Sequence, residues 1–360
     1  MKSTLAFIAI LFPFLAPAAP LRPPTPELPR LVLYHQTTHS NASRPISLLP
    51  LINNPRIALT HLIIAAFHVN ANSTIHLNDH PPSHARYRTL WREARALQSA
   101  GVKVLAMVGG AARGSFSPQT LDANSTAAFE RSYALLRDAV AEHGLDGVDL
   151  DVEEHMSLAG ITRLIARLRD DFGAGFVITL APVATALARR RRPLEVLPLG
   201  GGANAAAPVG GKNLSGFDYA ALEHEVGREV TFYNVQFYNG FGSVSGRNST
   251  MFDMIVDAGW EPRRIAVGQL TSPRNGGGFV EHADLGRAVG KLREKYGEIG
   301  GIGGWEYFNG VPGGAKRPWV WAEEMTRILR PGMGDLKIGR RMGKALKKRR
   351  VEGGSGQGRR

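Results

Sequence analysis

The segment LDGVDLDVE, residues 145–153, alternates acidic and apolar side chains over most of its length. Successive side chains of a β-strand point to opposite faces, so Asp149, Asp151 and Glu153 share one face of a predicted strand. Three like charges roughly 6–7 Å apart, in a place with little water, cannot all stay ionised cheaply. We therefore expect at least one carboxyl group to keep its proton near neutral pH, which supplies a general acid beside a carboxylate.

An alternative interpretation is a solvated edge strand with its acids turned outward. Acidic residues are poor strand formers, and three on one face carry a folding cost without cations nearby. The pattern therefore favours carboxylates that point into a protein interior.

Seven further apolar runs accompany this segment and alternate with stretches of helical periodicity. The eight runs are Leu31–Tyr34, His61–Val69, Val102–Val108, Leu145–Glu153, Phe176–Val183, Val230–Tyr238, Ile265–Leu270 and Gly301–Phe308. Residues 161–172 and 285–296 show the apolar spacing of one helix face. Eight strands that alternate with helices predict an α/β fold, a single-domain (β/α)8 TIM barrel.

An open, doubly wound sheet is the competing architecture, but no G-x-G-x-x-G follows the first run. In a barrel, active sites lie at the C-terminal ends of the strands. Glu153, which we expect to end its strand, is then the natural proton donor.

Composition excludes several classes of protein. The 360 residues are 43% hydrophobic and 21% charged, which rules out disorder as the main state. The absence of cysteine excludes disulfides, thiolate metal sites and cysteine nucleophiles.

The net charge of +13 is concentrated in two places: residues 331–360 hold ten Lys or Arg against two Asp or Glu, and residues 189–192 are four arginines. Without interleaved aromatics or a known module, these charges do not indicate nucleic-acid binding.

The ends of the chain differ from its body. Lys2, an apolar run over 5–16 and small residues at 16–18 predict a cleaved signal peptide over residues 1–19, and no later run is long enough to span a membrane. Residues 28–336 are expected to form the barrel, with a long loop over 187–216 after the fifth strand, and residues 337–360 a disordered basic tail. Five glycosylation sequons accompany the leader, at Asn41, Asn72, Asn124, Asn213 and Asn248. Together they predict a secreted, extracellular glycoprotein, and we expect a monomer.

The acidic segment resembles a known family. D-G-x-D-x-D-x-E, present here as residues 146–153, is similar to the signature of the family 18 glycoside hydrolases, which use a (β/α)8 barrel. The resemblance implies that Glu153 is the acid/base, that Asp151 orients the substrate's acetamido group and stabilises an oxazolinium ion, and that Asp149 supports Asp151. It implies no metal and no cofactor.

Other segments agree with this resemblance in order and position. Gln236-Phe237-Tyr238-Asn239 resembles the family's sixth-strand segment, where the Tyr238 hydroxyl would hydrogen-bond the acetamido oxygen, and Trp305 resembles the floor under the reacting sugar. Taken alone, Tyr238 and Trp305 would more simply be core residues. The predicted catalytic residues are Glu153, Asp151, Asp149 and Tyr238, and the predicted substrate-binding residues are Gln236, Asn239, Trp305, Gly109, Gly110 and Tyr34.

One segment departs from the family pattern. The third strand of the family often carries Ser-x-Gly-Gly, whereas this chain has Met107-Val108-Gly109-Gly110. The glycines still allow close approach of neighbouring groups, but a serine hydrogen bond to the acidic cluster is lost.

Residues 28–338 further resemble the secreted fungal endo-β-N-acetylglucosaminidases of this family, for example at residues 44–50, 60–63, 75–79, 108–116, 180–184 and 304–309. This resemblance implies cleavage between the two core N-acetylglucosamines of high-mannose N-linked glycans. A chitinase, which cuts the same linkage in chitin, is the close alternative, although only Trp305 of five tryptophans is expected at a strand on the active face. A non-catalytic sugar-binding protein is a further alternative, against which the presence of Glu153 argues.

Overall fold

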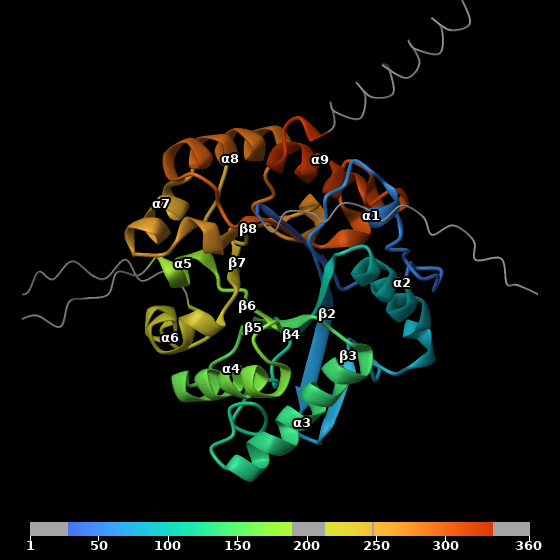
Figure 1. Ribbon diagram of the computed structural model, residues 1–360, viewed down its shortest axis with the longest axis vertical. Helices are drawn as coiled ribbons and strands as arrows, with labels where there is room; N and C mark the ends of the chain where they lie inside the picture. The colour runs from blue at the N-terminus through green and yellow to red at the C-terminus, as the bar shows by residue number, and fades with distance from the viewer. Residues whose placement is uncertain (1–27, 189–212, 247, 334–360) are drawn as a thin grey trace, which may run out of the picture.

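The computed structural model describes residues 28–188, 213–246 and 248–333. Within them, parallel strands form a closed ring at the centre of the molecule (Figure 1). The ring consists of β1 (Arg30–His35), β2 (His61–Asn70), β4 (Lys103–Gly109), β5 (Gly147–Asp151), β6 (Val177–Leu180), β7 (Phe232–Gln236), β8 (Ile265–Leu270) and β9 (Gly301–Trp305). β1 pairs with both β2 and β9, which closes the barrel and confirms the predicted fold. One strand not expected from the sequence, β3 (Thr74–Leu77), pairs antiparallel with β2 outside the ring.

Helices surround this ring (Figure 1). They are α1 (Pro50–Asn53), α2 (Arg88–Ser99), α3 (Thr126–His143), α4 (Leu158–Phe172), α5 (Ala184–Leu187), α6 (Tyr219–Val226), α7 (Thr250–Asp257), α8 (His282–Tyr296) and α9 (Val320–Leu329). The two predicted apolar helix faces are confirmed in α4 and α8, whose spaced aliphatic residues are buried against the strands. Ser157 begins α4 by accepting a hydrogen bond from the Gly160 N–H, the usual role of an N-cap serine.

The carboxylate strand is shorter than its sequence suggests. β5 ends at Asp151, so the expectation that Glu153 ends the strand was wrong by two residues. The reason lies in its neighbour: Asp151 pairs with Gly109, the last residue of β4, and the Gly110 N–H then bonds the Asp151 carbonyl at 2.8 Å. Gly109 and Gly110 both have positive φ, at 92° and 86°, so β4 turns away and β5 loses its ladder partner.

The ends of two other predicted strands also differ from the structure. β7 ends at Gln236 rather than Tyr238, and β9 ends at Trp305, where a short 3₁₀ helix over Tyr307–Asn309 replaces the predicted extension to Phe308. Gln236 and Trp305 are thus the last residues of their strands, whereas Tyr238 follows β7.

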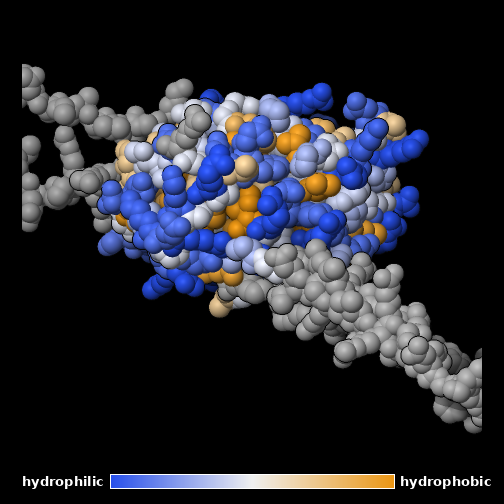
Figure 2. Space-filling view, turned by 90° about the horizontal axis from the view of Figure 1, so that it is seen from above, coloured by the Kyte–Doolittle hydropathy of each residue, from blue (hydrophilic) through white to orange (hydrophobic). Residues whose placement is uncertain are grey.

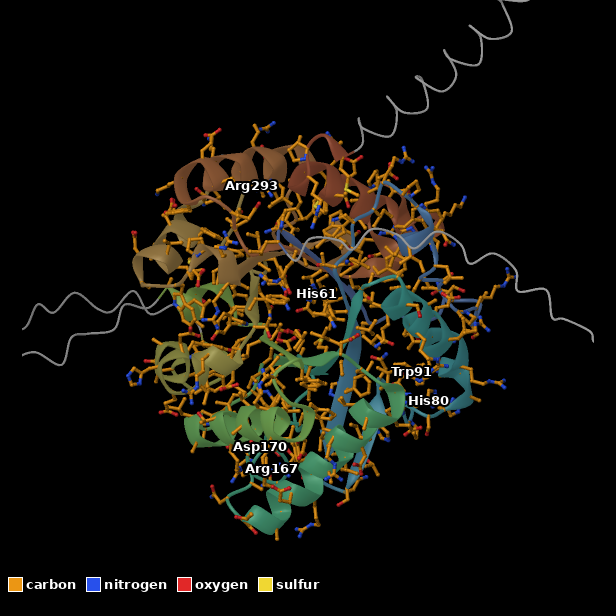
Figure 3. The ribbon with its side chains drawn as sticks, viewed as in Figure 1. His61, His80, Trp91, Arg167, Asp170 and Arg293 are labelled. Atoms are coloured by element: carbon orange, nitrogen blue, oxygen red, sulfur yellow. The ribbon has the colours of Figure 1, made fainter. Side chains whose placement is uncertain are left out.

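The N-terminal end of the barrel is closed by a cationic and aromatic layer. Arg30 lies over the Phe232 ring at 4.4 Å, and the His61 ring meets the same phenyl edge-on at 5.1 Å. His61 lies near the centre of the molecule, whereas Arg167 and Arg293 lie among the helices (Figure 3). Burial, with the nearby charges of Arg30 and Lys103, lowers the pKa of His61 to about 3, so this imidazole is neutral at physiological pH.

Several features of the outer surface are plain in the described residues. On the side seen in Figure 2, hydrophobic residues gather in small patches between hydrophilic ones. No helix in residues 28–188, 213–246 and 248–333 is both long and apolar enough to cross a bilayer. The predicted signal peptide (1–19), most of the predicted loop (187–216) and the basic tail (337–360) lie outside the described residues.

Candidate active site

Asp149 is the innermost carboxylate of the site. It is fully buried and accepts hydrogen bonds from Tyr34 Oη at 2.8 Å and Asn234 Nδ2 at 3.0 Å. A third donor, Thr179 Oγ1, lies on the neighbouring strand β6. Burial raises the pKa of Asp149, and the hydrogen bonds from Thr179, Asn234 and Tyr34 act in the opposite direction.

Asp151 lies one step further toward the C-terminal end of the barrel. Its side chain is 6% exposed and bonds Gln236 Nε2 at 3.2 Å. Burial raises the pKa of Asp151 well above its ordinary value, and the charges of Glu153 and Asp149 raise it further. Burial and the neighbouring carboxylates therefore favour the protonated form of Asp151, which lies two residues before the predicted proton donor Glu153.

Gln236 joins the two outer carboxylates. Its Nε2 atom lies 3.2 Å from Asp151 Oδ1, 3.1 Å from Glu153 Oε1 and 2.9 Å from the Ala181 carbonyl oxygen. An amide nitrogen carries two hydrogens, so it cannot serve three acceptors fully at once. Gln236 therefore links the Asp151 and Glu153 side chains through one shared donor.

Tyr238 and Trp305 line a small cavity with Asp151. The other residues around it are Tyr34, Ala181, Asn234, Gln236, Gly268, Gln269 and Gly303. The Trp305 ring meets the Tyr34 ring edge-on, with centroids 5.5 Å apart. Burial and the charges of Asp151, Glu153 and Asp149 raise the pKa of Tyr238, so its hydroxyl keeps its proton and can donate it in a hydrogen bond.

Comparison with known proteins agrees with this geometry. The model of the glycosyl hydrolases family 18 matches residues 30–269. The chain belongs to glycoside hydrolase family 18.

Two solved structures of family 18 proteins are similar over nearly their whole length. A fungal endo-β-N-acetylglucosaminidase is 49% identical, with a TM-score of 0.77, and the match covers 85% of this chain and 99% of that one. The chitinase ChiC of Aspergillus fumigatus is 45% identical, with a TM-score of 0.69, over 82% of this chain and 98% of that one. Chitinase 1 of Rhizopus niveus is 28% identical over 232 residues, which are 61% of this chain and 40% of that longer protein. The protein is therefore a glycoside hydrolase, and its fold agrees with both relatives of known structure.

The departure from the family 18 pattern at Met107 can be read in the structure. A side chain on Gly109 would meet the Phe116 ring at 2.3 Å and the Asp151 carbonyl at 2.6 Å, and one on Gly110 would meet Met107 Cε at 2.7 Å. Close packing against Phe116 and the Asp151 backbone thus requires glycine at position 109, and the positive φ of 86° favours glycine at position 110. Asp149 has Tyr34, Thr179 and Asn234 as donors, so its carboxylate is satisfied without a serine at position 107.

Glu306 is a residue of this site that sequence reasoning missed. Its buried carboxylate accepts hydrogen bonds from the Gln36 N–H at 3.0 Å, the Thr37 N–H at 2.8 Å and Thr37 Oγ1 at 2.9 Å. It thereby fastens the residue after Trp305 to the end of β1, close to Tyr34. Thr179 and Asn234 were missed as well, although polar residues within apolar strands, such as Asn234 two positions before Gln236, were an available signal.

Asn239 does not join the other predicted residues. It is exposed, with φ of 53°, and its Oδ1 accepts a hydrogen bond from the Gly277 N–H at 2.8 Å. It connects the loops after β7 and β8 and does not line the cavity beside Asp151. The remaining predicted residues lie together: Tyr34, Gln236, Tyr238 and Trp305 line that cavity, and Gly109 and Gly110 pack against Asp151.

A wider cleft meets the cavity at Trp305. Its lining residues come from the connection after β1, the loop after β8 and the segment after β9: Thr37, His39, Ser40, Asn41, Ala42, Ile46, Ser272, Arg274, Asn275, Trp305, Glu306, Phe308, Asn309, Val311, Gly314 and Ala315. It touches none of the three acidic residues of β5 and its continuation. Trp305 therefore lies where the small cavity beside Asp151 meets this wider cleft.

The described residues hold no group of three or more His, Cys, Asp or Glu side chains placed to bind a metal ion.

Proposed function

We propose that this protein is an endo-β-N-acetylglucosaminidase that hydrolyses the GlcNAc-β1,4-GlcNAc linkage in the core of high-mannose N-linked glycans, with retention of configuration. The reaction follows the substrate-assisted route known for this family, in which the substrate's own acetamido group replaces an enzyme nucleophile.

In the first step, Glu153 gives its proton to the leaving glycosidic oxygen. The acetamido oxygen of the sugar on Trp305 attacks C1, so the C1–O4′ bond breaks as a C1–O bond to the acetamido group forms. Asp151, ionised at this point, accepts the acetamido N–H, and the Tyr238 hydroxyl donates to the acetamido oxygen.

In the second step, water attacks C1 and gives a proton to Glu153. The acetamido group is thereby released and the acid is restored. The cycle needs one proton on the pair Asp151 and Glu153: it passes from Asp151 to Glu153 when the acetamido group binds, so that Glu153 is the acid and Asp151 is ionised. The raised pKa of the Asp151 carboxyl group and its link to Glu153 through Gln236 support this step.

The choice of substrate rests on the scarcity of large aromatic side chains in the wide cleft beside Trp305. Its aromatic residues are Trp305 and Phe308, and much of the rest of its lining is polar or small. Other tryptophans are used elsewhere: Trp91 stacks on His143 at 3.9 Å, Trp260 meets Tyr233 edge-on at 5.0 Å, and Trp321 is buried in α9. A branched, hydroxyl-rich glycan fits such a cleft better than a linear chitin chain, which favours a row of aromatic platforms.

A chitinase is the second candidate, favoured by the 45% identity with the chitinase ChiC. The two are distinguished by assays of one preparation on a high-mannose glycoprotein and on chitooligosaccharides. Release of the glycan, with one N-acetylglucosamine left on the protein and no cleavage of chitooligosaccharides, is the expected result. Cleavage of chitooligosaccharides alone would overturn the proposal, and binding without cleavage of either would identify a sugar-binding protein.

We also propose that the chain is secreted, on the basis of its apolar leader and its sequons. Expression of the full chain in a secreting host tests this: the expected product is in the medium and lacks the leader. Retention inside the cells with residues 1–19 intact would contradict the proposal.

A further inference from the structure

A short hairpin forms one wall of the wide cleft. His39 and Pro45 form an isolated antiparallel bridge, and the turn between them is closed by bonds from the Ser40 N–H to the Arg44 carbonyl and from the Ser43 N–H to the Ser40 carbonyl, both 2.8 Å. Asn41 and Ala42 at the tip of this hairpin line the same cleft as Trp305. The tip is also a glycosylation sequon, Asn41-Ala42-Ser43.

Asn41 differs from the other sequon asparagines. Its residue is exposed and no hydrogen bond engages its side chain in the described part of the chain. Asn213 is half-buried, and its Nδ2, the atom that would carry a sugar, donates to the Phe217 carbonyl at 2.8 Å. Asn72, Asn124 and Asn248 are exposed, but none of them lines the cleft beside Trp305.

We propose that Asn41 carries an N-linked glycan that obstructs the enzyme's own cleft, and that a second copy of the enzyme removes the obstruction by trimming this glycan to a single N-acetylglucosamine. The inference rests on the proposed function and on passage of the chain through the secretory pathway. It deepens the proposed function by naming a substrate: the enzyme's own N-linked glycan.

Chain polarity explains why the trimming has to come from another molecule. A productive substrate places its reducing, protein-linked end beside Glu153 and its mannose branches in the wide cleft. A glycan on Asn41 has its protein-linked end in the wall of that cleft, away from the proton donor. In its own molecule this glycan therefore runs through the cleft in the direction opposite to a productive substrate. It can fill the cleft, but it cannot present its GlcNAc-β1,4-GlcNAc linkage to Glu153.

Trimming itself is the proposed hydrolysis applied to the enzyme. The bond between the first and second N-acetylglucosamine breaks, water supplies the hydroxyl and the proton, and one sugar stays on Asn41. A single sugar is too short to fill a cleft that accepts an oligosaccharide, so trimming opens it.

The test uses the Glu153→Gln protein, secreted from an N-glycosylating yeast, because this variant cannot trim itself. Mass spectrometry of the peptide around Asn41 is expected to show an extended glycan. Addition of a small amount of wild-type enzyme is expected to reduce it to one N-acetylglucosamine, at a rate proportional to the wild-type concentration. An unmodified Asn41 would overturn the proposal.

Obstruction is tested separately by oligosaccharide affinity in the Glu153→Gln background. Asn41→Gln and Ser43→Ala each remove the sequon, and each is expected to lower the Kd for a free high-mannose oligosaccharide at least 5-fold; Asn124→Gln, which removes an exposed sequon that does not line the cleft, should leave the Kd unchanged. Equal Kd values in all four proteins would overturn the obstruction. If the Asn41 variants bind more tightly while wild-type enzyme trims no glycan on any protein, the proposed function fails and the trimming with it, but the obstruction stands.

Discussion

The two ends of the barrel both bury ionisable groups, but they do so with opposite results. At the N-terminal end, His61 is held neutral beneath Arg30, whose guanidinium lies on the Phe232 ring. At the C-terminal end, Asp149 and Asp151 are buried as a pair of carboxyl groups whose pKa values are both raised. At the N-terminal end, burial keeps the His61 imidazole uncharged and away from the active site. At the C-terminal end, burial favours the protonated forms of Asp149 and Asp151, close to Glu153.

This difference shows that burial favours the uncharged form of a histidine at one end and of carboxyl groups at the other, and that only the carboxyl groups lie at the candidate active site. A buried carboxyl group that is forced to stay ionised costs folding free energy, and a protein accepts that cost at a site where the proton is used. Burial raises the pKa of both carboxyl groups; three hydrogen-bond donors act against it at Asp149, whereas the charges of Glu153 and Asp149 add to it at Asp151.

The largest effect is expected at the acid itself. Glu153→Gln should lower kcat by about 10³-fold or more, since general acid–base catalysis alone contributes roughly 10²–10⁴-fold, while oligosaccharide binding and the melting temperature stay close to wild type. Glycan release and a binding isotherm measure the two properties. Glu142→Gln, at the exposed surface of α3, is the matched control, and near wild-type turnover by Glu153→Gln would remove Glu153 from the mechanism.

Asp151→Asn should reduce kcat by about 10²-fold and at the same time stabilise the fold. The pKa of Asp151 is raised in the folded protein, so its burial costs little stability at low pH and progressively more as the pH rises above the ordinary aspartate value. The gain in melting temperature over wild type is therefore expected to grow from pH 4 to pH 8. A gain in melting temperature that shrinks as the pH rises would mean that Asp151 ionises more easily in the folded protein than in the unfolded chain, and would contradict this prediction.

Tyr34→Phe removes one of the three donors to Asp149 and should lower kcat by about 10-fold. The lost hydrogen bond favours the ionised carboxylate, so its removal raises the pKa of Asp149 further and moves the acidic limb of the pH–rate profile to higher pH. Tyr296→Phe, whose hydroxyl bonds Asp253 on the outside of the barrel at 2.6 Å, is the control and should leave the profile in place.

The smallest effect on activity is expected at the opposite end. His61 and His35 are both buried with pKa values lowered to about 3, so the unfolded chain binds more protons than the folded one between about pH 6.5 and pH 3. Each of these two histidines should lower the free energy of unfolding by about 1.4 kcal/mol per pH unit as the pH falls through that window. His61→Gln is expected to reduce the slope of unfolding free energy against pH by about 1.4 kcal/mol per pH unit and to leave kcat within about 2-fold, as measured by denaturant unfolding at several pH values. Exposed His224→Gln is the control; an unchanged slope in His61→Gln would contradict the neutral state of His61.

Much of this contrast could be predicted from the sequence, and the remainder depends on tertiary contacts. The alternation in residues 145–153 correctly predicts that Val148, Leu150 and Val152 pack in the outer core while Asp149 and Asp151 face inward. Strand ends were not predictable, because β5 ends where Gly109 and Gly110 turn β4 away. The pKa shifts of the carboxyl groups were also not predictable from the sequence, since they depend on burial and on the donors from other strands that reach each carboxyl group.

Residues that act through loops were the hardest to find. Glu306 follows an apolar strand and resembles an ordinary surface acid in the sequence, yet it is 6% exposed and bonds two backbone N–H groups. Asn239 was predicted to contact the sugar because of its place in a familiar motif, and that role stays a prediction; its side chain accepts a hydrogen bond from the loop after β8.

The most direct test of the central claim is the pKa of Asp151 itself, measured by carbon-13 NMR of its side-chain carboxyl group in the free protein. We predict that the Asp151 carboxyl group stays protonated well above the pH at which ordinary aspartates ionise. Its pKa should fall in Glu153→Gln, where the neighbouring charge is absent. Titration of Asp151 at an ordinary aspartate pKa, unchanged by Glu153→Gln, would contradict a carboxyl pair that shares one proton.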